Sequence, residues 1–318
     1  MQALEKAFQE NYMKAQTLSQ QGDLQGAASA YKKCIDQFAG EDGTITMEDN
    51  GNGLHVHLYN QYGEVLQGMG ELDEAEDAFE QAAELAEAVL KSSVDADGLD
   101  TKTPTNEQEA KAQARRIQER KEQMRAYRSL ASLQSQQERI DDTIETFKRI
   151  RSAARNENEE ADAYKEIGIL YLRTGNLNAA IQTLEEAVAI DPEVRKGHSN
   201  LAIAYTRMLE DNPNLENQQE YIKKALINFD LALELDPESA SLHTNYGILL
   251  AQNEDWHFAK MAFREALRID PKNKLAKQNL NDVEMLVGQA SNMGAASDLQ
   301  PRHRPLMKRH IGPTPKIH

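Results

Sequence analysis

The feature that most constrains the fold is a pattern of small and large apolar residues that recurs along the chain at intervals of tens of residues. Its clearest copy is the segment from Tyr164 to Pro192, which reads YKEIGILYLRTGNLNAAIQTLEEAVAIDP. Two further copies start at Tyr246 and at Tyr59. Within each copy, apolar residues three or four positions apart form two stripes, each typical of one amphipathic helix. Each copy therefore predicts two helices joined by a short turn.

Small residues and turn residues in the clearest copy predict how its two helices pack. Gly168 and Ala180 carry little side chain, so the two backbones are expected to approach closely there. Gly175-Asn176 is expected to end the first helix and turn the chain. Asp191-Pro192 is expected to end the second helix, because proline disfavours helix in the residue before it.

This pattern resembles the tetratricopeptide repeat family over about residues 8–273. The resemblance implies an all-α fold, an α-solenoid of helix hairpins that form a right-handed superhelix, with a C-terminal capping helix and a disordered tail. The third repeat is the weakest match, because Thr143 replaces the small alanine and Glu138-Arg139 replaces the turn glycine. About six units are expected, at residues 8–41, 56–89, 124–157, 161–194, 195–239 and 240–273.

Insertions and end segments predict how the chain is divided. An apolar stripe of Leu275, Leu280, Val283 and Leu286 predicts the capping helix, which repeat arrays need for solubility. The expected division is an N-terminal pair of repeats at 1–89 with an inserted loop at 40–55, a linker and charged helix at 90–123, a C-terminal array of four units plus the capping helix at 124–288, and a basic, proline-containing, disordered tail at 289–318.

Composition and charge exclude several classes of protein. The net charge of −16 argues against nucleic acid as a partner of the helical body, because phosphate binding needs clustered cations. The tail carries a net charge of +4, so residues 1–288 carry −20. No apolar run approaches the roughly 20 residues of a membrane span. Cys34 is the only cysteine, so no internal disulfide is expected, and a cytoplasmic location is the simplest prediction.

The candidate binding residues lie on the side of each first helix that faces away from the second helix, since a helix turns by about 100° per residue. In the tetratricopeptide family, that side lines a concave groove that binds peptides. Cations predominate there in the third, fourth and fifth units, although the body is acidic overall. The expected groove residues are Arg125, Arg128, Lys165, Ile169, Arg173, Lys196, Asn200, Ile203, Arg207, Asn245 and Ile248.

One family-specific function is not supported. Some members hold the C-terminal Glu-Glu-Val-Asp of Hsp70/Hsp90 in a carboxylate clamp. Lys165 and Asn200 match that clamp, but Ile169 and Ser241 stand where the resemblance requires asparagine and lysine. Asn245 stands where it requires arginine, so the clamp is not expected here.

The sequence gives only weak signals for metal binding, catalysis or a cofactor. His55 and His57 lack a suitably spaced third ligand, so a surface pair of histidines is expected rather than a metal site. We find no nucleophile elbow, phosphate loop or zinc spacing, and therefore expect no catalysis and no cofactor.

The sequence favours a scaffold or adaptor that binds an acidic or extended peptide segment of another protein in the groove. Two alternatives stay open. One is a structural subunit of an oligomeric complex that uses convex faces, loops or the tail for contacts. The other is a regulatory module of an enzyme acting in trans.

Overall fold

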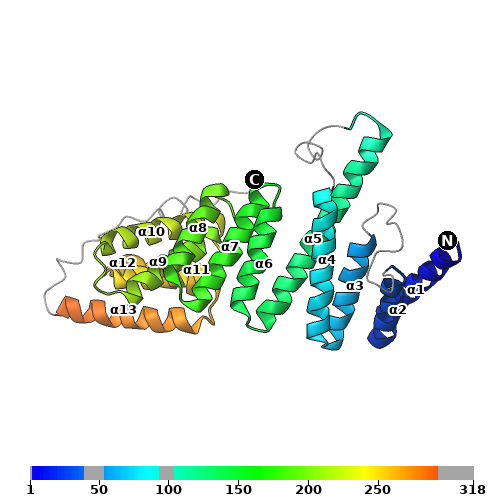
Figure 1. The fold of residues 1–318 in the computed structure, drawn as a ribbon. Helices are drawn as coiled ribbons and strands as arrows, with labels where there is room; N and C mark the ends of the chain where they lie inside the picture. Colours follow the sequence, from blue (N-terminus) through cyan, green and yellow to red (C-terminus); the bar gives the residue numbers. More distant parts are fainter. Residues whose placement is uncertain (1, 39–53, 93–103, 293–318) are drawn as a thin grey trace, which may run out of the picture. The chain divides into compact units, whose positions relative to one another are not determined.

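The chain is helical throughout the part that the structure describes. The computed structural model describes residues 2–38, 54–92 and 104–292. Within these ranges it contains helices and no strand (Figure 1). Most of the predicted loop at 40–55 and of the predicted tail at 289–318 lies outside the described residues, whereas residues 54–55 begin α3 and residues 289–292 end α13. The helices are α1 (Gln2–Gln20), α2 (Leu24–Phe38), α3 (Leu54–Met69), α4 (Leu72–Ser92), α5 (Glu107–Gln136), α6 (Ile140–Ala153), α7 (Glu157–Thr174), α8 (Leu177–Ile190), α9 (Gly197–Asp211), α10 (Gln218–Leu235), α11 (Ala240–Gln252), α12 (Trp256–Ile269) and α13 (Lys274–Asn292).

The helices are arranged as the predicted hairpins. In each pair from α1–α2 to α11–α12, the two helices pack against one another. The chain forms two compact units, residues 1–153 with α1 to α6 and residues 154–318 with α7 to α13. The third hairpin, α5–α6, belongs to the first unit, although the sequence grouped it with the later repeats. The predicted domain boundaries stay a prediction.

A glycine on the first helix, which has no side chain, lets the two helices of a hairpin approach closely, as the pattern predicts. A Cβ added at Gly247 of α11 would lie 2.6 Å from Cε1 of Phe263 on α12. A Cβ added at Gly168 of α7 would lie 2.6 Å from Cγ of Leu184 on α8. Both distances are far shorter than van der Waals contact, so no residue larger than glycine fits without displacing its neighbour.

Except in α9–α10, the turns between paired helices use the left-handed region of the backbone. Gly175 ends α7 with a φ of 76°, as expected, and Asn176 accepts a hydrogen bond from the Ala179 amide at the start of α8. The third hairpin lacks a turn glycine, and there Glu138 takes a φ of 58°. A non-glycine residue in this region costs about 1–2 kcal/mol. The weakest repeat therefore keeps the hairpin geometry at a conformational cost.

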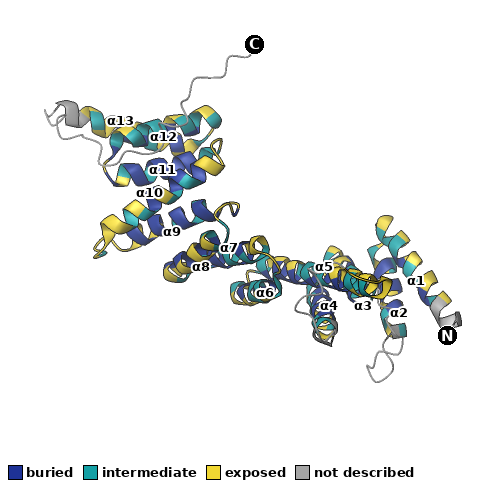
Figure 2. Cartoon of the chain, turned by 90° about the horizontal axis from the view of Figure 1, so that it is seen from above, coloured by how far each residue is buried: buried dark blue, intermediate teal, exposed yellow. Residues whose placement is uncertain are grey.

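The core of the second unit is continuous from α7 to α13. Tyr205, Phe229, Tyr246 and Phe263 are almost completely buried in it. Figure 2 shows the buried positions as stripes along α9 and α11. The hydroxyl of Tyr246 donates a hydrogen bond of 2.7 Å to the Asp230 carboxylate, which joins α11 to α10 inside the core.

The capping helix α13 is present, but the predicted stripe is only partly correct. Ala276 and Val283 are buried against the array, with Leu280 packed beside them. Leu275 and Leu286 are 50% and 48% exposed. Ala276 and Val283, rather than Leu275 and Leu286, therefore face the array.

The charged helix predicted before the third repeat is the first half of α5, and it packs on α3 through polar groups. Nδ1 of His57 lies 3.0 Å from Oε1 of Glu122, and the Asn60 amide donates to Oε2 of Glu122 at 3.0 Å. His55 is 6% exposed. The prediction of a surface pair of histidines is therefore wrong. Burial raises the pKa of Glu122, but hydrogen bonds from His57 and Asn60 outweigh it, so this pKa lies below its usual value.

None of the described helices is long and apolar enough to cross a membrane.

We expect Gly247→Ala to lower the free energy of unfolding by about 1–3 kcal/mol, because the added methyl group overpacks the contact with Phe263. Gly288→Ala is the matched control, since a Cβ at this position in α13 meets no atom within 4 Å. The control should stabilise the protein by about 0.5–1 kcal/mol through helix propensity. Urea unfolding followed by circular dichroism measures the free energy of unfolding of both variants and of the wild type. Equal effects of the two substitutions would contradict the close-approach account.

The lowered pKa of Glu122 has a consequence for stability. A carboxyl group whose pKa is lowered by folding contributes in full above its unfolded pKa of about 4.3, and this contribution is lost as the pH falls through the folded value. Glu122→Gln should therefore lower the free energy of unfolding by about 1–3 kcal/mol at neutral pH. The difference from wild type should shrink in acid. This difference in the free energy of unfolding is measured by urea unfolding at several pH values between about 7 and 3, the range of carboxyl titration. Glu145→Gln, at an exposed position, is the control. A difference independent of pH would contradict the assignment.

Candidate functional site

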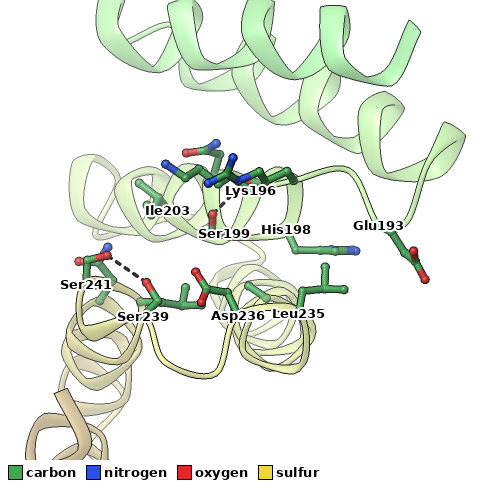
Figure 3. A pocket seen from close by; sticks show the side chains of 14 residues that line it. Glu193, Lys196, His198, Ser199, Ile203, Leu235, Asp236, Ser239 and Ser241 are labelled. Atoms are coloured by element: carbon green, nitrogen blue, oxygen red, sulfur yellow. Dashed lines mark hydrogen bonds between the residues drawn. The ribbon is translucent and has the colours of Figure 1, made fainter. Parts of the chain in front are cut away.

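A pocket of about 570 Å³ in the second unit could receive a ligand. It lies among the connector before α9, the start of α9, the end of α10 and the start of α11 (Figure 3). Four of the predicted groove residues line it: Lys196, Asn200, Ile203 and Asn245. The structure thus brings together residues from two successive first helices.

Two helices begin at this pocket without a side-chain cap. Lys196 is the N-cap residue of α9, with a φ of 64°, and its side chain makes no capping hydrogen bond. Ser239 is the N-cap residue of α11 and likewise makes no side-chain cap. The first amide groups of a helix have no partner within it, and they carry a partial positive charge. Both helix starts therefore favour a hydrogen-bond acceptor.

Charged side chains of both signs surround these helix starts. Arg195 and Lys196 contribute two cations, and Glu193 and Asp236 contribute two carboxylates. None of the four forms an ion pair with another described residue. Figure 3 shows Glu193 at one end of the pocket, with Lys196 and Asp236 on opposite sides. The side chains alone are nearly balanced, and the two helix starts add positive potential.

A histidine holds the connector that carries the two cations. Nε2 of His198 lies 3.1 Å from the carbonyl oxygen of Pro192, and Nδ1 lies 2.7 Å from Oδ1 of Asn228. His243 repeats the contact, with Nε2 lying 2.9 Å from the carbonyl oxygen of Pro237. In both repeats the histidine follows the proline by six residues. This recurring spacing fixes the connectors beside the pocket.

The amides at the pocket are available for a ligand. Nδ2 of Asn200 is buried and has no hydrogen-bond partner among the residues that the structure describes. Asn245 occupies the corresponding place on α11 and lines the same pocket. Ile203 and Ile248 are half-buried against the core, one turn or less beyond these amides. An amide that is desolvated without a partner costs about 1–3 kcal/mol, which a bound acceptor could recover.

The other predicted groove residues of the second unit lie outside this pocket. Nζ of Lys165 lies 2.6 Å from Oδ1 of Asp162 and 3.4 Å from Oε1 of Glu166. Arg207 donates to the carbonyl oxygen of Leu172 at 3.1 Å. Ile169 is half-buried and Arg173 is exposed, on α7. Lys165 and Arg207 therefore already have partners within the fold.

A second, smaller pocket of about 340 Å³ lies between α3 and α5 of the first unit. It is lined by Arg125 and Arg128, two of the residues predicted for the groove, together with Lys121 and two serines of α5. Nη2 of Arg125 lies 2.6 Å from Oε1 of Glu64 on α3. Arg128 and Lys121 are exposed and form no ion pair with a described residue. The free positive charge here comes from Lys121 and Arg128.

Sequence reasoning missed Arg195 and Lys121. Arg195 stands in the connector before α9, outside the helical positions used to assign the groove. Lys121 lies one helical turn before Arg125, in the part of α5 that the sequence treated as a linker helix. Its spacing from Arg125 and Arg128 was the available signal.

No group of three or more metal-ligating side chains occurs within the described ranges 2–38, 54–92 and 104–292.

Comparisons with known proteins are consistent with this architecture. Residues 11–37, 56–89 and 161–194 match the family model described as Tetratricopeptide repeat. The crystal structure of the C-terminal part of a TPR repeat-containing protein from Cytophaga hutchinsonii superimposes with a TM-score of 0.52 at 15% identity, covering 91% of this chain and 90% of that chain. This likeness concerns the fold alone.

Two curated relatives share only part of their length with this chain. The type IV pilus assembly protein PilF of Pseudomonas aeruginosa is 30% identical over 130 residues, 40% of this chain and 47% of PilF. The human protein O-mannosyl-transferase TMTC1 is 23% identical over 125 residues, 39% of this chain and 13% of TMTC1. The chain thus spans less than half the length of both relatives.

The repeated hairpins, the close approach at Gly168 and Gly247, and the matched segments lead to one assignment. This chain is a tetratricopeptide repeat protein, an all-α solenoid of the kind that serves as a protein–protein interaction module.

Proposed function

We propose that this chain is a scaffold or adaptor that binds an extended, acidic peptide segment of another protein along the first helices of its second unit. The observation that carries the proposal is the pocket at the start of α9 and α11. There two unpaired cations, two uncapped helix starts and an unpartnered buried amide come together. A carboxylate of the peptide, on a side chain or at the chain end, would occupy this pocket.

The preference for an anion rests on the local balance of charge. Arg195 and Lys196 oppose Glu193 and Asp236, so the side chains alone give no preference. Each helix N-terminus adds about half an elementary positive charge, which favours a carboxylate. A carboxylate also accepts several hydrogen bonds at once, and the amide groups of both helix starts can donate them.

The preference for an extended peptide rests on side chains that recur at equivalent places on α9 and α11. Asn200 and Asn245 occupy equivalent places on α9 and α11, and their amides can bind the backbone of a peptide that crosses both helices. Ile203 and Ile248, packed on the core beside them, would contact apolar side chains of the same peptide. Ordered polar anchors with apolar contact between them are typical of peptide recognition.

The first unit offers a second surface for acidic groups. Lys121 and Arg128 are unpaired cations on one face of α5, and Gln67 and two serines add hydrogen-bonding groups. We include this pocket in the proposal as an independent contact for negatively charged segments. Because both cations are exposed, its contribution to affinity should fall with added salt.

The structural-subunit alternative has one observation in its favour. Leu275, Met285 and Leu286 expose apolar side chains on α13, and Met285 is 62% exposed. Met285 and Leu286 are adjacent in the chain, and adjacent exposed apolar side chains can form part of a protein contact. Sedimentation of the purified chain above its monomer mass would support this alternative.

The transferase name belongs to a relative of which this chain matches 13%, so we propose a binding role without catalysis. Cys34 is a buried free thiol, which fits the predicted cytoplasmic location.

We expect the double reversal Arg195→Glu, Lys196→Glu to weaken capture of the acidic partner at least about tenfold, because each charge-assisted hydrogen bond contributes about 1.5–3 kcal/mol. Lys223→Glu, Lys277→Glu is the matched control, since both lysines are exposed on the same unit without an ion pair. Affinity capture from native lysate with quantitative mass spectrometry compares wild type and both variants. All three should first give the same helical circular dichroism. A partner list that changes equally in both variants, or in neither, would contradict the proposed pocket.

A further inference from the structure

A pocket of different chemistry lies in the first unit, among α2, α3 and α4. Its volume is about 210 Å³, the scale of one long side chain rather than of a folded partner. Tyr59 and Tyr62 of α3 are half-buried and pack on the core of this unit. Ile35 and Ala78 complete the apolar part of the lining. The pocket therefore presents two phenol rings in an apolar setting.

Three carboxylates surround these rings. Asp36 comes from α2, and Glu74 and Asp77 come from the first turns of α4. All three are exposed, and none forms an ion pair with a described residue. Lys32 also lines the pocket but lies outside ion-pair distance of them, so the four charged side chains sum to −2.

The tyrosine hydroxyls of the pocket are likewise unpaired within the described part of the chain. Neither Tyr59 nor Tyr62 makes a hydrogen bond to a described residue. Two phenols and three carboxylates thus face one small cavity without any interaction among them that stabilises the fold. A structural role would have paired at least some of these groups with the cations of neighbouring helices, as Arg139 pairs with Glu76 in the same unit.

We propose that this pocket binds an arginine side chain from a basic segment of a partner protein. A guanidinium group is planar, so it can stack on a phenol ring and also donate hydrogen bonds to carboxylates at its edge. A pocket lined by two phenol rings and three carboxylates fits this combination. Lysine would satisfy the charge but neither the stacking nor the paired donation.

The ionisation of the phenols supports the sign of the ligand. Burial raises the pKa of Tyr59, and the Asp36 carboxylate raises it further. Burial also raises the pKa of Tyr62, with further contributions from Glu74 and Asp36. The carboxylates therefore impose a negative potential at both rings, which a bound cation would offset.

This inference goes beyond the proposed function, because it concerns a separate pocket among α2, α3 and α4 and a ligand of opposite charge. An acidic segment would bind at first helices, whereas a basic segment would bind in the furrow that α2 and α4 form with α3. A chain with both sites could hold two segments of unlike charge at once.

The test observes the two tyrosines directly. The full-length chain is labelled with 3-fluorotyrosine, and its ¹⁹F resonances are assigned with Tyr59→Phe and Tyr62→Phe. Nα-acetyl-arginine methylamide is then titrated, with the citrulline analogue as a neutral ligand of nearly the same shape. The expected result is a saturable shift of the Tyr59 and Tyr62 resonances, with binding of citrulline weaker by at least about tenfold. Equal responses to the two ligands, or none at these resonances, would overturn the proposal.

Two triple variants distinguish the effect of the pocket carboxylates from the effect of the net charge of the protein. Asp36→Asn, Glu74→Gln, Asp77→Asn should abolish the arginine-dependent shift. Asp141→Asn, Asp211→Asn, Glu234→Gln removes the same charge at exposed positions outside the pocket and should retain it. An unchanged shift in the first variant, or equal loss in both, would contradict the site. The comparison of the arginine and citrulline ligands is made on the wild-type sequence, so it does not depend on whether a charge variant folds.

Discussion

The structure depends on the contact between a glycine of one helix and a large side chain of the helix that follows. At Gly63, Gly168 and Gly247, an added Cβ would lie 2.6–2.7 Å from a side-chain carbon of the partner helix. This contact fixes the approach of the two helices in α3–α4, α7–α8 and α11–α12, and the small, buried Ala202 takes the place of the glycine on α9. Equivalent positions on successive first helices then present their side chains in the same direction, so a pair such as Asn200 and Asn245 can serve one ligand.

The distribution of charge gives this regular framework its chemical selectivity. The net charge of −16 is not spread evenly, because unpaired cations lie at the first helices and unpaired carboxylates lie between α2 and α4. Cations that form ion pairs within the fold, such as Lys165, lose most of their attraction for a ligand. The kind of ligand that each pocket attracts therefore depends on which charged side chains lack partners within the fold, rather than on the net charge of the protein.

The sequence predicted the hairpins and their turns because these depend on local features, such as the position of Gly168 and Gly175. It also predicted four residues of the main pocket, because a helical repeat determines which positions share a face. It could not predict that Lys165 contacts Asp162 and Glu166, since that depends on side-chain rotamers. Nor could it predict the contact of His57 with Glu122, which are 65 residues apart and meet through the packing of α3 on α5.

The central claim is that the first helices of the second unit hold the peptide. Site-specific photo-crosslinking tests it most directly, with a benzophenone amino acid at Ser199 or Ser241 in the pocket, or at Lys223 or Glu234 on exposed positions of α10 outside the pocket. The account predicts that one partner is crosslinked from Ser199 and Ser241 and not from the α10 positions. Crosslinks to the same partner from Lys223 and Glu234 alone would show that the peptide binds elsewhere.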